Sequence, residues 1–423
     1  MLKVEERSLV HPCFDEEAKH TNARVHLPVA PKCNVQCNYC NRKYDCVNES
    51  RPGVTSSLLE PFQAIEYLKE LNDRMNNISV IGIAGPGDPF ANARQTLETM
   101  RRAKVAFPEK IFCLSTNGLE LEPHIEEIAA LGVTYVTLTI NAVDPAISAR
   151  IYKWVRFNNR LYRGLEGARI LLDRQLACIP KLKGKGIIVK INSIIIPGIN
   201  EDHIEAVAKK CAGLGADVIN CIPLIPTTET AFADYPKPDP KMIFKTRTLA
   251  SEHLKLMSHC ARCRADAAGL LGQDLSETHA LLKEYASRLD LETIGRPYVA
   301  VATNEGLLVN VHLGEAGVLY IYEQSPNGFK FVEERMTPPH GTGDKRWLDL
   351  AGSLEDCRAL LVSGVGENPK VMLKSCGIHV VEMTGLIDEG LEGVYNNRVI
   401  RSIAKPDAFK CGSSCRGNAQ GCA

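Results

Sequence analysis

The 423-residue chain lacks an apolar run long enough to cross a membrane, and it lacks an excess of charge of either sign. Lysine and arginine total 50, and aspartate and glutamate also total 50. Because there is no excess of basic residues, the composition does not indicate that the protein binds nucleic acid or an anionic membrane. The first fourteen residues carry Glu5, Glu6 and Arg7 and have no apolar core, so we do not expect a signal peptide. We therefore expect a cytoplasmic protein with no nucleic-acid or membrane partner.

Sixteen cysteines are present, yet a chain of this kind is not expected to build a disulfide framework. Some lie inside apolar or helical stretches and are predicted to be small core residues: Cys178, Cys211, Cys221, Cys357 and Cys376. The others lie at loop-like positions or in paired motifs: Cys13, Cys33, Cys37, Cys40, Cys46, Cys113, Cys260, Cys263, Cys411, Cys415 and Cys422. That is more thiols than one metal cluster requires.

The length exceeds that of one ordinary hydrophobic core, so we expect two domains. Residues 24–290 alternate strand-like runs with amphipathic helical stretches, which is typical of α/β folds built from βαβ units around a parallel sheet. Six such units predict a partial (β/α)6 barrel, in which working residues gather where the strands end. The strands are expected at Arg24–Ala30, Ser79–Ala84, Ile111–Ser115, Tyr135–Ile140, Gly186–Ile196 and Ala216–Ile222.

Three cysteines with the spacing C-x₃-C-x₂-C, namely Cys33, Cys37 and Cys40, directly follow the first of these strands. Three thiolates from one loop can bind three irons of a four-iron cubane and leave the fourth iron open to a small molecule. The spacing resembles the signature of the radical S-adenosylmethionine (SAM) superfamily, in which the open iron chelates SAM and one electron cleaves it to a 5′-deoxyadenosyl radical. The alternatives are packed cysteines or a zinc loop completed by Cys46, although structural zinc usually uses two separated pairs.

Polar and glycine-rich residues follow the other predicted strands. The turn that contains Gly85, Gly87 and Asp88 can bind the ammonium group of SAM through its backbone, as the Gly-Gly-Glu turn does in that superfamily. The alternative is a tight turn that needs glycine for its conformation. Further polar side chains at strand ends are candidates for the carboxylate and ribose of SAM: Ser115, Asn117, Asn141 and Ser193.

Several thiols outside the signature also require an explanation. Cys46 follows the cysteine loop, Cys113 lies at the end of the third strand, and Cys260 and Cys263 form a C-x₂-C pair in a polar context. Cys13 lies near His11 and His20 in the N-terminal segment, residues 1–23. These residues can hold one or two additional clusters beside the first if their segments fold over the barrel. The alternatives are a core position for Cys113 and structural zinc or an unligated pair for the C-x₂-C motif.

A new pattern begins after Gly295-Arg296-Pro297, a natural domain boundary. Short strand-like runs come first, followed by a helix expected from about Ser353 and by alternating strands and helices, so residues 298–405 are predicted to form a small α/β domain. The final stretch, 406–423, is small, polar and glycine-rich, and we interpret it as a flexible tail. Its cysteines, Cys411, Cys415 and Cys422, are left without an assigned role.

Longer motifs extend the resemblance from the superfamily to one family. Residues 24–56, the motif Gly-Ile-Ala-Gly-Pro-Gly-Asp-Pro at 82–89, Cys-Leu-Ser-Thr-Asn-Gly at 113–118, Ile-Pro-Gly-Ile-Asn at 196–200 and the segment 260–266 closely resemble the NifB family of nitrogenase cofactor maturases. The resemblance implies that two further four-iron clusters bind near the SAM site and are fused, with an added sulfur, into an eight-iron precursor of nitrogenase cofactor. One SAM gives the methyl group that becomes the central carbide, and a radical from a second SAM abstracts a hydrogen from it.

Carried over by position, the resemblance implies that Cys33, Cys37 and Cys40 hold the radical-generating cluster. It implies that the substrate clusters bind to the other motif residues: Cys13, Cys46, Cys113, Cys260 and Cys263, with His11 or His20. Glu49 and Arg51 then face those clusters as catalytic candidates, with the carboxylate acting in proton transfer. The alternative for both is a solvent-facing loop charge.

The second domain resembles the NifX-like, RNase H-like module that carries nascent cofactor. The matching pieces are Val311–Ala316 and Ser363–Asn368, and His312 is the candidate contact, with a scaffold histidine as the alternative. The resemblance implies cluster donor proteins, an electron donor and a downstream cofactor carrier or assembly scaffold as partners. Two other functions remain alternatives, a radical SAM enzyme acting on an organic or peptide substrate and a non-catalytic iron–sulfur scaffold.

Overall fold

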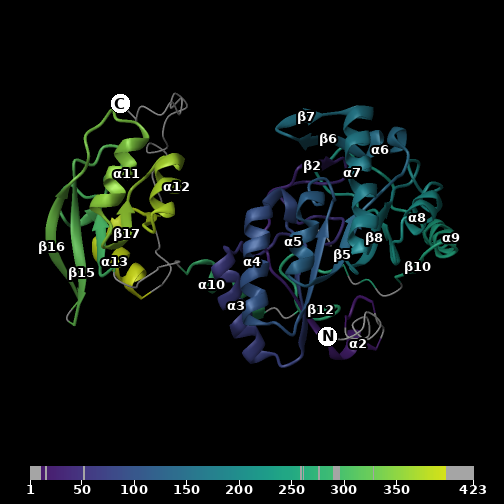
Figure 1. Ribbon diagram of the computed structural model, residues 1–423, viewed down its shortest axis with the longest axis horizontal. Coiled ribbons are helices and arrows are strands. Elements are labelled where there is room, and N and C mark those ends of the chain that lie inside the picture. The colour runs from purple at the N-terminus through teal and green to yellow at the C-terminus, as the bar shows by residue number, and fades with distance from the viewer. Residues whose placement is uncertain are drawn as a thin grey trace. The chain divides into compact units, whose positions relative to one another are not determined.

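The structure is a computed structural model that describes residues 11–14, 17–50, 53–257, 260, 262–274, 277–288, 296–326 and 328–396. The chain divides into two compact units, Met1–Ala286 and Ser287–Ala423 (Figure 1). Arg51 and the tail cysteines named above lie outside the described residues, so their predicted roles have no structural counterpart here. No helix in the described part of the chain combines the length and the apolar character that crossing a bilayer requires.

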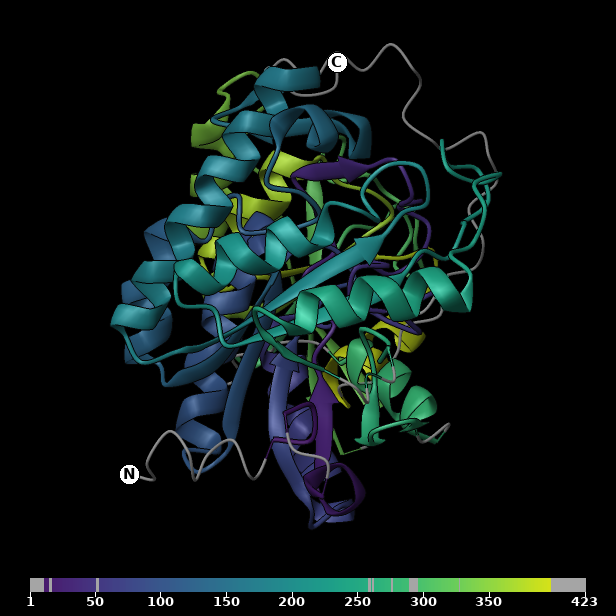
Figure 2. The ribbon, with the colours of Figure 1, turned by 90° about the vertical axis from the view of Figure 1, so that its right-hand side faces the viewer.

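A curved sheet forms the centre of the first unit and confirms the predicted α/β class. Its strands lie in the order β10-β9-β8-β5-β4-β3-β1-β11-β12, and each neighbouring pair from β10 to β1 is parallel. The bounds are β1 Ala23–His26, β3 Ile78–Ile83, β4 Ile111–Thr116, β5 Val133–Thr139, β8 Ile188–Ile195, β9 Val218–Pro223, β10 Lys255–Leu256, β11 Ala268–Leu270 and β12 Gln273–Asp274. All six predicted strands are therefore present, and the antiparallel pair β11 and β12 extends the sheet beyond β1. In Figure 2 the purple strand β1 lies beside the blue-violet strand β3.

Helices connect the strands, and apolar spacing explains which face each buries. Helix α3 begins after Glu60, whose backbone N–H donates to the Gln63 side chain at 2.8 Å, and it turns Ala64, Leu68 and Leu71 toward the sheet. The other helices of this unit are α2 Ala18–Thr21, α4 Ala93–Ala106, α5 Ile125–Ala130, α6 Pro145–Ile151, α7 Gly164–Gly184, α8 Ile204–Gly213, α9 Pro240–Ser251 and α10 Glu277–Ala286. Figure 1 shows α3, α4 and α5 along the outside of the sheet.

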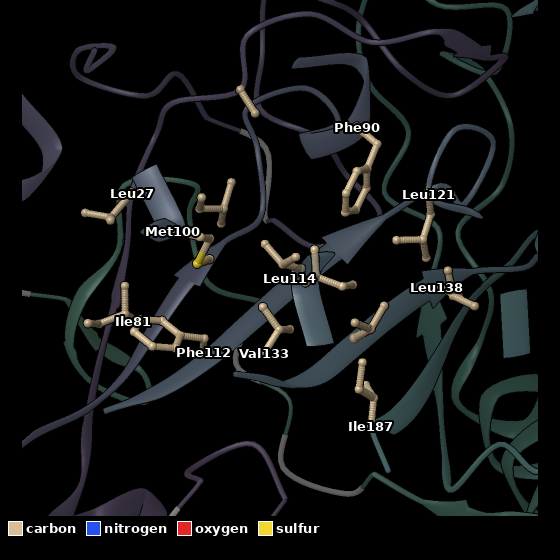
Figure 3. Close-up of a cluster of buried hydrophobic side chains, with 14 of the residues drawn as sticks. Leu27, Ile81, Phe90, Met100, Phe112, Leu114, Leu121, Val133, Leu138 and Ile187 are labelled. Atoms are coloured by element: carbon tan, nitrogen blue, oxygen red, sulfur yellow. The ribbon is translucent and has the colours of Figure 1, made fainter. Parts of the chain in front are cut away.

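The main core lies between the sheet and these helices. Ile81, Phe112, Leu114 and Leu138 point into it and are almost fully buried, as Figure 3 shows. Burying apolar surface stabilises the fold by roughly 25 cal/mol per Å². Since successive residues of a strand face opposite sides of a sheet, the intervening positions, such as Cys113, face the interior of the barrel.

A small second sheet holds the cysteine loop. Strand β2, Val35–Cys37, pairs antiparallel with β6, Tyr152–Phe157, which forms a hairpin with β7, Arg160–Tyr162. The backbone N–H of Asn38 also donates to the carbonyl of Ile151 at 2.8 Å. The loop that carries the three signature cysteines is therefore fixed by strand pairing, which its sequence does not predict.

The second unit contains a five-stranded sheet in the order β16-β15-β13-β17-β18, with β13, β17 and β18 parallel to one another. Its elements are β13 Tyr298–Val301, β14 Leu308–Val309, β15 Val318–Ser325, β16 Gly328–Met336, α11 Asp344–Ser353, β17 Cys357–Val362, α12 Glu367–Ser375, β18 His379–Glu382, β19 Gly385–Leu386 and α13 Ile387–Tyr395. The predicted α/β domain is confirmed. The helix expected from Ser353 is wrong, because α11 ends there and fully buried Leu354 leads directly into β17.

Candidate active site

A cavity lies where the cysteine loop crosses the carboxyl ends of the parallel strands, and we call it the first cavity. Cys33, Cys37 and Cys40 line it, together with Cys46 from the following turn. Cys37 is the last residue of β2, so the pairing of β2 with β6 positions this part of the loop. The structure brings the three signature cysteines together and adds a fourth.

The cysteines of the first cavity are not arranged around a single metal ion. Tetrahedral zinc, with Zn–S bonds of about 2.3 Å, brings its sulfurs to within about 4 Å of one another. Among the described residues, the one trio of Cys, His, Asp or Glu whose ligand atoms all lie within 4.8 Å is Glu205, Glu252 and His253, which lie outside both cavities. The cysteines of the first cavity therefore suit a larger group, such as a four-iron cubane, better than zinc.

Burial keeps these thiols protonated while no metal is bound. Burial raises the pKa of Cys33 to about 12, with Asp88 adding to the increase and Arg42 opposing it. Burial also raises the pKa of Cys37 and of Cys40. Because thiolates are the ligands of iron, binding of a cluster must displace these protons.

The turn after β3 is packed against the backbone that precedes Cys33. The backbone N–H of Gly87 donates to the Ala30 carbonyl at 2.6 Å, and that of Asp88 donates to the Lys32 carbonyl at 2.8 Å. A Cβ atom at Gly87 would lie 2.1 Å from the carbonyl oxygen of Lys32, so only glycine fits there. This close approach fixes the backbone that leads to Cys33 against the end of β3.

The buried carboxylate of Asp88 joins the ends of two strands. It accepts hydrogen bonds from the backbone N–H of Phe90 at 2.9 Å, the hydroxyl of Thr116 at 2.9 Å and the backbone N–H of Asn117 at 2.6 Å. These donors occupy its oxygens, so the side chain of Asp88 positions the turn. Gly85 lines neither cavity, and its predicted contact with SAM gains no support from its position.

The candidate SAM contacts at the strand ends separate into two groups. Ser115 and Asn117 line the first cavity, and Asn117 donates through Nδ2 to Asn34 Oδ1 at 2.7 Å. Asn141 and Ser193 line neither cavity. The structure therefore brings only the first two beside the signature cysteines.

Asn141 and Ser193 have local partners instead. The amide nitrogen of Asn141 donates to the hydroxyls of Tyr39 at 2.7 Å and Tyr152 at 3.1 Å. The hydroxyl of Ser193 donates to the carbonyl of Ile140. Both side chains are almost completely buried, and these bonds connect neighbouring segments of the barrel.

A second cavity lies inside the barrel, closer to the beginnings of the strands. Cys13, Cys113, Cys260 and Cys263 line it, and they come from three separate parts of the chain. Cys113 is the third residue of β4, two residues before Ser115, and not at the strand end where the sequence analysis placed it. Four of the predicted cluster ligands therefore share one cavity.

One of two histidines, His11 or His20, was predicted to accompany these thiols, and the structure distinguishes between them. His11 lines the second cavity, whereas His20 is exposed on α2 and lines neither cavity. The Nδ1 atom of His11 accepts a hydrogen bond from the backbone N–H of Cys13 at 3.1 Å, and Nε2 is buried without a hydrogen-bond partner in the described structure. Burial, followed by Lys190, lowers the pKa of His11 to about 3, so its ring is neutral. Iron ligation through Nε2 would move the ring proton to Nδ1 and break the bond to Cys13.

A third histidine, His26 on β1, also lines the second cavity, and the sequence analysis overlooked it. Its Nδ1 atom lies 3.0 Å from the carbonyl oxygen of Arg264, which can only accept, so Nδ1 donates its proton there. Histidines that bind metals commonly donate their other ring N–H to a carbonyl in this way, which fixes the ring. The alternation of β1 places His26 on the same face as Arg24, which also lines the cavity, and that signal was available in the sequence.

Glu49 lies between the two cavities and lines both, as do Ala84 and Ser115. The side-chain amide of Asn192 on β8 donates to Glu49 Oε1 and to the carbonyl of Asn48, the latter at 2.9 Å. Burial raises the pKa of the Glu49 carboxyl, while Lys190 and the hydrogen bond from Asn192 oppose that rise. The carboxylate is therefore held at the boundary between the two cavities, where Glu49, Ala84 and Ser115 line both, and we call this boundary the seam.

In the second unit, His312 forms an isolated parallel bridge with Gly364, which follows β17. Its Nδ1 atom accepts a hydrogen bond from the backbone N–H of Gly314 at 3.0 Å. The carboxyl ends of parallel strands are the usual position of ligand sites in open α/β sheets. His312 therefore lies at the edge of the sheet where a ligand would be expected.

Comparison with known proteins agrees with this geometry. Residues 27–211 match the model of the radical SAM superfamily, and residues 296–397 match the model described as dinitrogenase iron-molybdenum cofactor. The first unit is thus a radical SAM domain, which uses a four-iron cluster and SAM, and the residues of the first cavity fit such a group.

The particular family follows from relatives that match nearly the whole chain. The chain is 48% identical to the FeMo cofactor biosynthesis protein NifB of Chlorobaculum tepidum over 97% of this chain and 98% of that protein. It is 38% identical to NifB of Klebsiella pneumoniae over 89% of this chain and 87% of that protein, and 36% identical to NifB of Azotobacter vinelandii over 92% and 88%. The chain belongs to the NifB family and is a radical SAM enzyme of FeMo cofactor biosynthesis.

Proposed function

We propose that this enzyme fuses two four-iron clusters around a carbon taken from the methyl group of SAM, adds a sulfur, and so makes the eight-iron precursor of nitrogenase cofactor. The observation that carries the proposal is the sharing of Glu49, Ala84 and Ser115 by the two cysteine-lined cavities. A reaction that begins in the first cavity can therefore reach a cargo held in the second.

The first cavity is the proposed position of the resident cofactors. Cys33, Cys37 and Cys40 would hold the four-iron cluster, and Asn117 and the Gly87 turn would contact SAM. When bound, this pair supplies a methyl group and a 5′-deoxyadenosyl radical. The role of the protein is to leave one iron without a side-chain ligand and to keep SAM beside the second cavity.

The second cavity is the proposed position of the substrate clusters. Cys13, Cys113, Cys260 and Cys263 offer thiols, and His26 offers an imidazole nitrogen whose ring is already fixed by Arg264. His11 is a further candidate whose bond to Cys13 makes it easier to release as the clusters fuse. We propose His26 in place of exposed His20.

Cys46 is the one cargo candidate that lies on the other side of the seam. It lines the first cavity, and it begins the turn that leads to Glu49, since the backbone N–H of Glu49 donates to the Cys46 carbonyl at 3.2 Å. We propose that its thiol binds a substrate cluster as that cluster approaches SAM. Arg51 stays a proposed neighbour on the same loop.

Glu49 is the proposed base that accepts protons as hydrogens leave the methyl carbon. Its carboxylate lines both cavities, and Asn192 fixes one of its oxygens. Burial raises the pKa of Glu49, which makes the carboxylate a better proton acceptor than an exposed glutamate.

The second unit is proposed to hold the finished precursor, with His312 as its contact, until a carrier or assembly scaffold takes it. Donor proteins for four-iron clusters and a one-electron donor are the other partners that this chemistry requires. The match of residues 296–397 to the family described as dinitrogenase iron-molybdenum cofactor supports this part of the proposal.

The experiment is anaerobic iron analysis and a 5′-deoxyadenosine assay on three single variants. Cys33→Ala should lose SAM cleavage and the four-iron cluster of the first cavity. Cys113→Ala should still cleave SAM and should lose iron only from the substrate clusters of the second cavity. Cys376→Ala is the matched control, since Cys376 lies in the second unit and lines neither cavity. Loss of the same cluster in Cys33→Ala and Cys113→Ala would contradict the division into two cavities.

A further inference from the structure

The second cavity contains more positive than negative charge. Arg24, Lys190 and Arg262 line it, and among the described residues the only carboxylate in its wall is Glu49. Among the described residues, three cationic side chains and one carboxylate therefore line this cavity.

The two arginines are held by backbone carbonyls. Arg24 donates through Nη1 to the carbonyls of Gly269 at 2.5 Å and Leu270 at 2.9 Å, and through Nε to the sulfur of Cys263 at 3.2 Å. Arg262 donates to the carbonyl of Pro223. These contacts give both guanidinium groups partners in the wall, and they explain why arginine is tolerated there.

Lys190 is placed differently. It projects from the middle of β8, 6% exposed, beside its register partner Thr137, which also lines the second cavity. Asn192, two residues farther along the same face of β8, is the residue that fixes Glu49. One strand face therefore positions both the ammonium group inside the cavity and the amide that holds the carboxylate at the seam.

The carboxylate of Glu49 explains why Lys190 stays charged. Burial alone would lower the pKa of Lys190, but the Glu49 carboxylate acts to raise it, and the net change is upward. A buried ammonium group is costly unless an anion opposes it. Cationic side chains outnumber carboxylates among the described residues of the wall, so the cavity is suited to an anionic occupant, and a four-iron cluster with thiolate ligands is such an occupant.

We propose that Lys190 is a positioning residue for the substrate clusters: its fixed positive charge compensates the negative charge that arrives with their thiolate ligands, and it keeps the Glu49 carboxylate directed to the seam. This inference rests on the proposed function, since it requires clusters in the second cavity. A compensating cation favours the reduced, more negative state of a nearby cluster. Lys190 therefore makes the substrate clusters easier to reduce than they would be beside a neutral residue.

The test is a redox titration of anaerobically loaded full-length protein, followed by electron paramagnetic resonance and by iron analysis. Added SAM identifies the resident cluster, because only its signal changes. Lys190→Met should shift the midpoint potential of the SAM-insensitive clusters to more negative values and leave the SAM-sensitive cluster nearly unchanged. Lys190→Arg, which keeps the charge, should behave like wild type. Lys209→Met removes a lysine from the exposed face of α8 and serves as the control.

The outcomes separate this inference from the proposed function. If Lys190→Met loses the SAM-insensitive clusters and Lys190→Arg retains them, the result would also support a requirement for positive charge at this position. Unchanged potentials in fully loaded Lys190→Met, or equal loss of clusters in both variants, would overturn the inference alone. A wild-type protein that never holds a SAM-insensitive cluster would overturn the proposed function and the inference together.

Discussion

Gly82 on β3 is the register partner of His26 on β1, and a Cβ atom at Gly82 would lie 2.9 Å from His26 Cδ2. Real Cβ atoms do not approach other heavy atoms this closely. The absence of a side chain at Gly82 therefore leaves the space that the imidazole occupies, while the carbonyl of Arg264 fixes its rotation. Both features hold the proposed nitrogen ligand against the second cavity.

Gly82→Ala should displace the His26 ring and remove a nitrogen ligand from a substrate cluster. The expected result is loss of the nitrogen hyperfine coupling seen by pulsed electron paramagnetic resonance in the SAM-insensitive clusters, with SAM cleavage retained. Gly184→Ala is the matched control, because nothing lies within 4 Å of a Cβ atom built at Gly184. Unchanged coupling in Gly82→Ala would contradict the assignment of His26.

Gly87→Ala should impair the cluster that binds SAM and leave the substrate clusters in place. Its Cβ atom would meet the backbone of Lys32 rather than a movable side chain, so Cys33 must shift. We expect loss of the SAM-sensitive cluster and of 5′-deoxyadenosine formation, while the second cavity still loads iron. Retention of SAM cleavage at the wild-type rate would show that the contact between Gly87 and Lys32 does not position the cysteine loop.

Glu49→Gln should separate radical generation from precursor formation. The glutamine keeps an oxygen for the hydrogen bond from Asn192 but cannot accept a proton. Removal of a general base typically costs roughly 10²- to 10⁴-fold in rate, so precursor formation should fall by that factor. The rate of SAM cleavage should stay close to wild type in the 5′-deoxyadenosine assay, and equal loss of both activities would contradict the proposed role.

His11 should make the cluster-free protein sensitive to mild acid. Its pKa is about 3 in the folded chain and 6.5 when unfolded, so the unfolded state binds more protons between these values, and stability falls as pH decreases through that window. Between pH 7.5 and 5.5 the free energy of unfolding should decrease by about 1.4 kcal/mol more in wild type than in His11→Gln. Urea unfolding at the two pH values measures this difference, and identical losses would contradict burial of a neutral ring.

The architecture of the first unit was predictable because its strands are continuous apolar runs separated by amphipathic helices. The same logic found Cys33, Cys37 and Cys40, whose spacing is local. The hairpin β6–β7 that supports them was not predictable, since nothing near residue 155 indicates pairing with Val35. Contacts between segments so distant in sequence depend on the folded chain.

The site was harder to predict at the level of single residues. Ser193 and Asn192 are adjacent, and the sequence analysis chose Ser193, but successive strand residues face opposite sides, so Asn192 reaches Glu49 and Ser193 does not. His26 was overlooked because a histidine inside a strand has no motif of its own. The alternation of β1 places it on the face of Arg24, but the contact that fixes its ring exists only when the loop around Arg264 lies beside β1.

The central claim is that one iron of the cluster in the first cavity has no side-chain ligand, although Cys46 lies in the same cavity. Electron–nuclear double resonance with SAM labelled at its amino nitrogen and carboxylate oxygen tests this directly, in wild type and in Cys46→Ala. The account predicts coupling of both labelled atoms to the cluster in the two proteins alike. Coupling that is absent in wild type and present only in Cys46→Ala would show that Cys46 occupies the fourth iron, and it would contradict the account.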